Sequence, residues 1–194
     1  LLPGTESWGQ NSSQVGLCVT TEENGQRTPV PFEIPKDYIG AWLLRDPAWD
    51  WTTLTFEKFE ELFEYSVREF AEIATDNPDL SGFRDSGGKL MITHGANDEV
   101  IFSQGTVDYY RRVQEAMGDP QETASFVRLF IPYGEGHGHL TKGPGISTAA
   151  GMAALMDWVE NGKAPDAILA EKFDLSTGQV TMTREAKEFH LISK

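Results

Sequence analysis

Two stretches decide the fold of this chain, GKLMITHGAND at residues 88–98 and RLFIPYGEGH at residues 128–137. Each begins with a short apolar run that is typical of a buried strand, and each ends in a Gly-rich turn. The first turn presents Asp98 and the second presents His137. Together they supply an acid and a base but no nucleophile.

The residues between the two stretches predict a helix over residues 103–117, closed by Gly118 at the position where a helix C-terminus favours glycine. Its apolar residues share one stripe: Val107, Tyr110, Val113 and Met117. Strand, helix and strand in this order predict a βαβ unit with parallel strands and a right-handed crossover. Ligands bind beyond the carboxyl ends of such strands, so Asp98 and His137 are expected in one crevice.

An Asp and a His that meet there indicate the base half of a Ser-His-Asp triad, in which the carboxylate orients the imidazole. The α/β-hydrolases place these residues in the order Ser, Asp, His, and Asp98 and His137 follow that order. Taken singly, Asp98 also fits a turn cap and His137 an ordinary loop histidine. Their position at two successive strand ends favours catalysis.

Two serines of this chain resemble nucleophiles only superficially. Ser147 lies in GISTA at residues 145–149, but no strand leads into this segment, and a nucleophile elbow needs a strand-to-helix turn. We interpret Ser147 as the cap of a helix predicted over residues 148–161. Ser86 precedes a strand instead of following one, which predicts a turn residue.

Seven segments stand in an order and at spacings that match a known family: DLSGFR at 79–84, GGKL at 87–90, HGAND at 94–98, TVDYY at 106–110, GEGH at 134–137, GPG at 143–145 and DWVENGKAP at 157–165. They resemble the tannase and feruloyl esterase family of α/β-hydrolases, which includes mono(hydroxyethyl) terephthalate hydrolase. The resemblance covers about residues 37–170, and Pro3, Gly4 and Trp8 resemble the end of the family's lid domain.

By this resemblance, Asp98 is the triad acid and His137 the triad base, with His139 as the reserve base if the loop is shifted by two residues. The nucleophilic Ser is expected N-terminal to Leu1 in a Gly-x-Ser-x-Gly elbow. The chain is then the C-terminal part of an enzyme and works with that N-terminal portion. The family usually has a Cys after its catalytic His, bonded to a Cys beside the Ser; Gly138 stands there instead, so this disulfide cannot form.

The predicted fold class is α/β. Residues 37–194 are expected to form the C-terminal part of an α/β-hydrolase doubly wound sheet, and residues 1–36 the end of a lid domain, as irregular Pro-rich surface chain. The resemblance implies a structural calcium in the lid, but its Asp-rich loop is not in this sequence, so no cofactor is expected in this chain.

Two further regions have a clear pattern. From the N-cap Thr55 to about Thr75, apolar residues recur at helical spacing and are expected to face a core: Phe59, Leu62, Phe63, Val67, Phe70 and Ile73. Three tryptophans precede this helix and either anchor it or line a pocket for an aromatic acyl group: Trp42, Trp49 and Trp51. Residues 167–173 and 179–183 predict a hairpin.

The net charge of −14 argues against nucleic acid and anionic membranes as partners. No apolar run approaches the roughly 20 residues needed to span a bilayer. Cys18 is either a buried thiol or a bridge to the missing portion, and Asn11 opens a glycosylation sequon. Secretion or a periplasmic location is implied by the resemblance alone.

The predicted function is a serine esterase that hydrolyses esters of aromatic carboxylic acids of the galloyl, feruloyl or terephthaloyl type. One alternative is a non-catalytic binding module that retains a hydrolase-like fold. A second is a metal-dependent hydrolase, since His94, Asp98, His137 and His139 are ligand types that suit zinc. No third well-spaced ligand accompanies the His137-Gly-His139 motif, which disfavours this second alternative.

Overall fold

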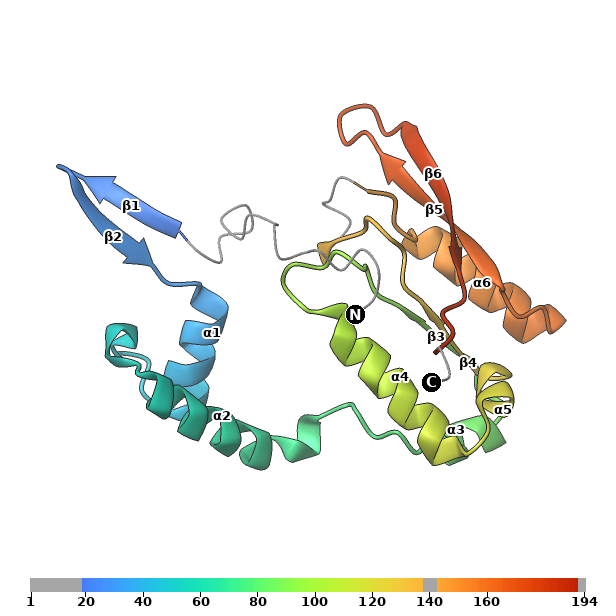
Figure 1. Cartoon of the computed structure of the whole chain (residues 1–194), viewed down its shortest axis with the longest axis horizontal. Helices are drawn as coiled ribbons and strands as arrows, with labels where there is room; N and C mark the ends of the chain where they lie inside the picture. Colours follow the sequence, from blue (N-terminus) through green and yellow to red (C-terminus); the bar gives the residue numbers. More distant parts are fainter. Residues whose placement is uncertain (1–18, 138–142, 192–194) are drawn as a thin grey trace. The chain divides into compact units, whose positions relative to one another are not determined.

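A computed structural model describes residues 19–137 and 143–191 of the chain (Figure 1). The chain divides into two compact units, with the boundary between Thr75 and Asp76. The predicted strand, helix and strand around Asp98 and His137 lie in the second unit. The end of a lid domain at residue 36 stays a prediction.

The first unit contains an antiparallel hairpin of β1 (Val19–Glu23) and β2 (Gln26–Val30). Its two turn residues, Asn24 and Gly25, have positive φ angles of 53° and 75°, as a type I′ hairpin turn requires. The prediction of irregular chain over the first 36 residues is therefore wrong for residues 19–30. The Asn-Gly turn sets the pairing there, and the prolines do not prevent it.

Short helical segments and one long helix complete this unit: α1 (Glu33–Asp37), the π-helix η3 (Tyr38–Leu43), the 3-10 helix η4 (Trp51–Thr53), α2 (Phe56–Glu69) and the 3-10 helix η5 (Ala71–Ile73). Thr55 begins α2 as predicted, because its Oγ1 accepts a hydrogen bond from the Lys58 N–H at 3.1 Å. The small core of the unit consists of Ile39, Leu43 and Leu62, and Trp49 packs against it.

Most of the apolar stripe of α2 is exposed. Of its side chains only Leu62 is buried, whereas Phe59, Phe63 and Val67 are exposed, and Phe56 at the start of the helix is 90% exposed. The prediction that this stripe faces a core is therefore wrong for most of its members. Helical spacing predicts an apolar face, but burial also needs a surface for that face to pack against.

The second unit has the predicted βαβ order: β3 (Leu90–Thr93), α4 (Ser103–Met117) and β4 (Val127–Phe130). The two strands pair in parallel. The bounds of α4 are the predicted ones, and Gly118 ends it with a left-handed φ of 83°. Two short helices also belong to this unit: α3 (Ser81–Asp85) precedes β3, and α5 (Pro120–Ala124) lies between α4 and β4.

Successive residues of β4 point to opposite faces of this sheet. Leu129 packs with Tyr110 and Val113 of α4 in one buried cluster. Phe130 packs in another cluster, against which Ala154 of α6 (Thr148–Asn161) lies. A helix therefore covers each face, which is the arrangement of a doubly wound α/β fold.

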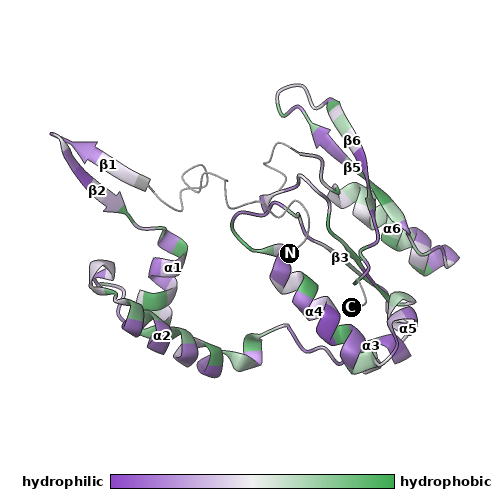
Figure 2. Cartoon of the chain, in the orientation of Figure 1, coloured by the Kyte–Doolittle hydropathy of each residue, from purple (hydrophilic) through white to green (hydrophobic). Residues whose placement is uncertain are grey.

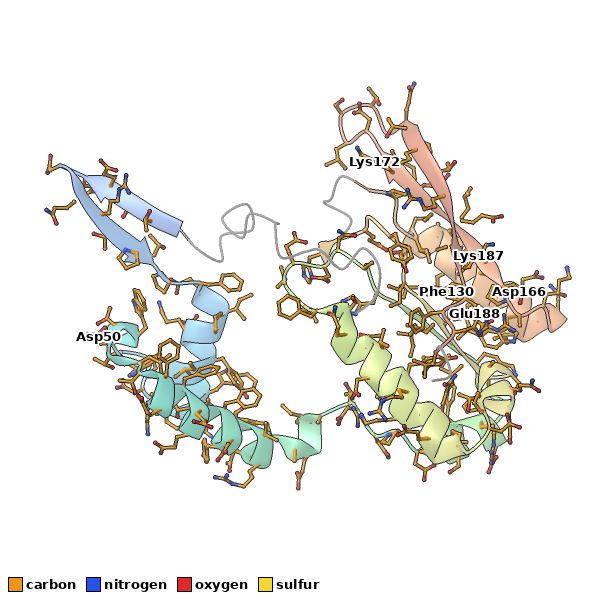
Figure 3. The ribbon with its side chains drawn as sticks, in the orientation of Figure 1. Asp50, Phe130, Asp166, Lys172, Lys187 and Glu188 are labelled. Carbon is orange, nitrogen blue, oxygen red and sulfur yellow. The ribbon has the colours of Figure 1, made fainter. Side chains whose placement is uncertain are left out.

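The remaining strands form the predicted antiparallel hairpin, β5 (Ala167–Phe173) and β6 (Val180–Lys187). Beyond β6, Glu188 forms an antiparallel bridge with Phe130, and Figure 3 labels both residues. The Phe189 N–H also donates to the Leu129 carbonyl at 2.8 Å. The chain thus adds an antiparallel segment beside β4, and the α/β prediction is confirmed.

Hydropathy differs between the elements (Figure 2). The hairpin of β1 and β2 is mostly hydrophilic, while β3 and much of α6 are hydrophobic. Across residues 19–137 and 143–191, no helix is both long and apolar enough to cross a membrane.

Candidate active site

The loops that follow β3 and β4 run side by side beyond the ends of the two strands. The His94 N–H donates to the Phe130 carbonyl at 3.1 Å, and the Ala96 N–H donates to the Pro132 carbonyl at 3.0 Å. These bonds continue the pairing of the strands into the loops. As a result, residues that follow β3 lie against residues that follow β4.

Asp98 and His137 meet at this place. His137 Nδ1 lies 3.1 Å from Asp98 Oδ2. Because an ionised carboxylate can only accept, Nδ1 donates this bond, and a neutral ring then has its lone pair on Nε2. The Asp98 side chain is 8% exposed, whereas that of His137 is 46% exposed. The ring therefore has a buried orienting partner and remains accessible itself.

Two backbone amides hold the other oxygen of Asp98. Its Oδ1 accepts from the Val100 N–H at 2.9 Å and from the Ile101 N–H at 2.8 Å. Burial alone would raise the pKa of Asp98, but these two N–H groups and His137 stabilise the carboxylate and lower the pKa overall. Asp98 is thus held as an anion with its Oδ2 directed at the imidazole.

His94 is a second imidazole beside Asp98, with Nε2 3.4 Å from Asp98 Oδ2. The same Nε2 lies 2.8 Å from the Ile101 carbonyl, and Nδ1 lies 2.7 Å from Thr106 Oγ1. A carbonyl only accepts, so Nε2 donates, and in the neutral ring Nδ1 accepts from the hydroxyl. In the sequence His94 stands out only as a candidate zinc ligand, and nothing in the sequence pattern indicated that it supports the Asp98 loop.

Glycine at two positions makes room for the loop that leads to His137. A Cβ atom at Gly95 would collide with the backbone of Glu135, and one at Gly145 would collide with the Glu135 side chain. Glu135 is buried between them. The two chain segments therefore approach more closely here than residues with side chains would allow.

Ser147 and Ser86, the two serines that superficially resemble nucleophiles, have local structural roles, as predicted. Ser147 Oγ accepts from the Ala150 N–H at 3.2 Å and caps α6. Ser86 Oγ donates to the Phe83 carbonyl at 2.7 Å in a turn.

Several predicted positions lie outside the described residues. They are the reserve base His139, the substituted Cys position Gly138, Cys18, the sequon at Asn11 and the lid motif at Pro3.

In the part of the chain that the structure describes, no group of three or more His, Cys, Asp or Glu side chains could hold a metal ion. The metal-dependent hydrolase therefore has no set of ligands there. Both ring nitrogens of His94 have hydrogen-bond partners. His137 uses Nδ1 for Asp98.

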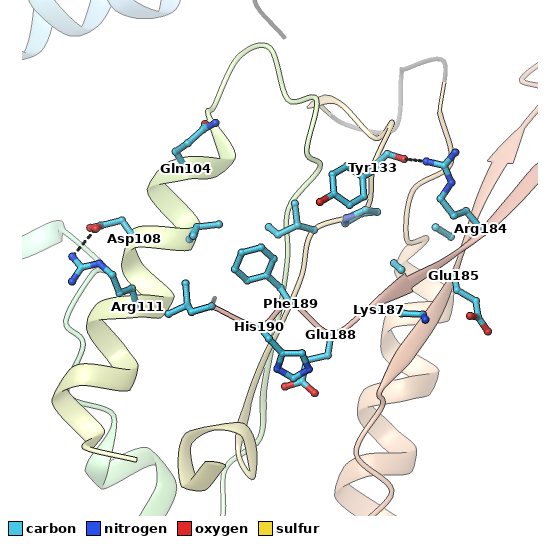
Figure 4. Close-up of a pocket in the computed structure, with 16 residues that line it drawn as sticks. Gln104, Asp108, Arg111, Tyr133, Arg184, Glu185, Lys187, Glu188, Phe189 and His190 are labelled. Carbon is cyan, nitrogen blue, oxygen red and sulfur yellow. Dashed lines mark hydrogen bonds and ion pairs between the residues drawn. The ribbon is translucent and has the colours of Figure 1, made fainter. Parts of the chain in front are cut away.

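A cavity of about 790 Å³ lies between α4 and the segment that follows β6 (Figure 4). Neither Asp98 nor His137 lines it. Glu188 does, and its Oε1 has no hydrogen-bond partner among the described residues. Burial raises the pKa of Glu188, although Arg128 and His190 oppose the rise. This cavity is distinct from the acid and base pair.

The chain is similar to known proteins over nearly its whole length. A family model described as tannase and feruloyl esterase matches residues 4–190. A probable feruloyl esterase from Arthroderma benhamiae is 35% identical over 184 residues, which cover 94% of this chain and 34% of that protein. A probable feruloyl esterase B-2 from Aspergillus terreus is 33% identical over 185 residues, with 84% of this chain and 32% of that protein covered.

The chain is also similar to solved structures of a feruloyl esterase and a tannin acyl hydrolase. Feruloyl esterase B from Aspergillus oryzae aligns with a TM-score of 0.69 at 28% identity, over 82% of this chain and 33% of that chain. Tannin acyl hydrolase from Aspergillus niger aligns with a TM-score of 0.74 over 88% of this chain and 33% of that chain. Its identity of 22% supports the fold alone. The chain spans about a third of the length of the curated relatives it matches.

Proposed function

The chain belongs to the tannase and feruloyl esterase family, and from this premise we propose that it is the C-terminal part of a serine esterase that hydrolyses esters of aromatic carboxylic acids. The galloyl, feruloyl and terephthaloyl groups are the acyl groups proposed. The family membership and the named relatives support ester hydrolysis. A secreted or periplasmic location belongs to the same proposal and rests on the resemblance.

One observation carries the proposal: the hydrogen bond of 3.1 Å between His137 Nδ1 and Asp98 Oδ2. It fixes the tautomer in which Nε2 can accept a proton. In the proposed reaction, His137 takes the proton of a serine hydroxyl while the serine oxygen bonds to the ester carbonyl carbon. His137 then gives the proton to the leaving alcohol as the ester C–O bond breaks, and Asp98 stabilises the imidazolium in between.

Water completes the proposed cycle. His137 takes a proton from water, whose oxygen attacks the acyl-serine carbonyl, and the proton returns to the serine oxygen as the carboxylic acid leaves. The serine and the oxyanion hole are proposed to lie N-terminal to Leu1, in the portion that supplies a Gly-x-Ser-x-Gly elbow. That portion is the proposed partner of this chain.

A fluorophosphonate probe, applied to the full-length protein, tests the proposal. The probe should label one serine N-terminal to Leu1, and His137→Ala should abolish the labelling because the serine then lacks its base. Hydrolysis of a feruloyl or galloyl ester should be lost in the same variant. A folded full-length protein that neither reacts with the probe nor hydrolyses aromatic esters would instead support the non-catalytic binding module.

A further inference from the structure

Asn97 joins the two loops that bear Asp98 and His137. Its backbone N–H donates to the Glu135 carbonyl at 2.9 Å. Its side-chain Oδ1 accepts from the Gly134 N–H at 3.0 Å. We call these two bonds the Asn97 link. A single residue, adjacent to Asp98, thus bonds to two consecutive residues just before His137.

The loop held by this link lies close to neighbouring backbone. Gly134 has a φ of 99°, and a Cβ atom there would lie 3.0 Å from Gly143. Gly95 lies against the Glu135 backbone on the opposite loop, closer than any side chain would permit. The place of His137 is therefore determined by how Gly134 and Glu135 sit on the loop after β3.

The direct bonds of His137 to the Asp98 loop are the longer ones. The His137 N–H lies 3.4 Å from Glu99 Oε2, at the limit of a hydrogen bond, and the ring bond to Asp98 is 3.1 Å. The two bonds of the Asn97 link, at 2.9 and 3.0 Å, have the ordinary length of an amide hydrogen bond, and both reach the backbone of the loop that precedes His137. The link is thus the better candidate to fix the loop.

We propose that Asn97 is a positioning residue that holds the loop before His137, so that the imidazole meets Asp98 at the correct distance. This inference rests on the proposed function, in which His137 is the base. Asn97 itself does not touch the reacting atoms. Its Oδ1 acts through the Gly134 N–H, so an oxygen at this position is what the role requires.

The test compares three variants of the full-length protein. Asn97→Ala removes the acceptor of Gly134, and kcat on an aromatic ester should fall about 100-fold, because a misplacement near 1 Å has this effect. KM should change little, because the link orients the base and not the substrate. Asn97→Asp keeps an oxygen in place and should restore most of kcat. Asn161→Ala is the matched control, since it loses the bond to Asp157 at the end of α6, and it should keep the wild-type kcat.

Amide hydrogen exchange supplies a measurement that does not depend on activity. In Asn97→Ala, the peptide covering residues 133–137 should exchange faster, while the β4 peptide stays protected. If Asn97→Ala does not fold, Asn97→Ser withdraws the acceptor more mildly and takes its place in both measurements.

Unchanged exchange and unchanged kcat in Asn97→Ala would overturn the inference, as would failure of Asn97→Asp to restore kcat above the Ala value. Full activity of His137→Ala would instead overturn the proposed function. The exchange result would still report whether the link holds the loop, so the two failures are distinguishable.

Discussion

The loop after β3 and the turn between β5 and β6 contain the same local structure around an aspartate. Asp98 Oδ1 accepts from the amides of Val100 and Ile101, and Asp174 Oδ1 accepts from the amides of Ser176 and Thr177 at 2.8 and 3.1 Å. In both cases the donors lie two and three residues ahead. The pKa of each aspartate is lowered, with hydrogen bonds among the causes.

The two regions differ in what the second oxygen meets. Asp98 is buried and its Oδ2 reaches His137 from another strand end, whereas Asp174 lies exposed in a turn. The turn itself needs only the backbone amides two and three residues after the aspartate, so it can form wherever the chain turns. The contact between Asp98 and His137 depends on two strand ends that the βαβ crossover brings together. Asp174 and its turn are therefore a control for Asp98 and its loop.

The largest effect is expected from replacing the two aspartates. Asp98→Asn keeps an Oδ1 for the turn but can present an N–H to His137, which forces the ring into the tautomer that cannot accept a proton on Nε2. Loss of this control costs about 10⁴-fold in kcat in the trypsin triad. Asp174→Asn should leave kcat within a few-fold. Steady-state kinetics of the full-length protein on an aromatic ester measures both variants. Equal kcat values would show that Asp98 has no role that Asp174 lacks.

Replacing a glycine by alanine should destabilise the protein more in the Asp98 loop region than in the Asp174 turn. Gly95→Ala pushes a methyl group into the Glu135 backbone, so the free energy of unfolding should fall by about 3 kcal/mol, at the upper end for overpacking. Gly178→Ala meets no atom but adopts a φ of 70°, which costs about 1 kcal/mol. Urea denaturation of both variants measures the difference. Only Gly95→Ala should also lower kcat, and a larger loss of stability in Gly178→Ala would contradict the close approach of the loops.

Thr106→Val tests the support that His94 gives to the Asp98 loop. The variant removes the hydroxyl that lies 2.7 Å from His94 Nδ1, and the free energy of unfolding should fall by about 1 kcal/mol, the usual net value of a hydrogen bond. Thr177→Val in the β5 to β6 turn loses exposed hydrogen bonds to the Gln179 N–H, at 3.3 Å, and to Asp174. It should change stability less, because water can replace bonds at an exposed site. Thermal denaturation measures the stability of both variants. Equal stability would refute the idea that His94 supports the Asp98 loop.

The smallest effect concerns pH. Because the pKa of Asp98 is lower in the folded protein than in the unfolded chain, its contribution to stability is present above the unfolded value of about 3.9 and is lost as pH falls through the folded value. Asp98→Asn should therefore make the free energy of unfolding less dependent on pH below about 4. Asp174→Asn should flatten this dependence less, because solvent screens an exposed carboxylate. Urea denaturation at several pH values below 5 measures this pH dependence in both variants. A larger flattening in Asp174→Asn than in Asp98→Asn would contradict the prediction.

Elements whose limits are set by local signals were predictable from the sequence. The bounds of α4 and α6 follow from an apolar stripe that ends at Gly118 and Gly162, and both glycines adopt the left-handed conformation. The β1 to β2 hairpin has an equally local signal in Asn24-Gly25, although the prolines that follow it, Pro29 and Pro31, are typical of irregular chain.

Features that depend on distant contacts were not predictable. The exposed face of α2 has the same periodicity as a buried one, and only the packing reveals the difference. Strand order alone predicted that Asp98 and His137 would meet, and the structure brings them together, while their catalytic roles stay predictions. The parts played by His94 and Asn97 depend on which loop atoms come within hydrogen-bond distance, and no spacing in the sequence encodes that.

From the α4 crossover we also expect a definite order of folding in the second unit. Helix contacts are local and form within about a microsecond, whereas β3 and β4 can pair only after the long segment between them has closed. The bonds between the strand-end loops, including Asn97 with Gly134 and Asp98 with His137, are expected to form after that pairing. Substitutions in these loops are then expected to accelerate unfolding and to leave the refolding rate nearly unchanged. We therefore expect the proposed catalytic pair to be among the last parts of the unit to be ordered and among the first to be released.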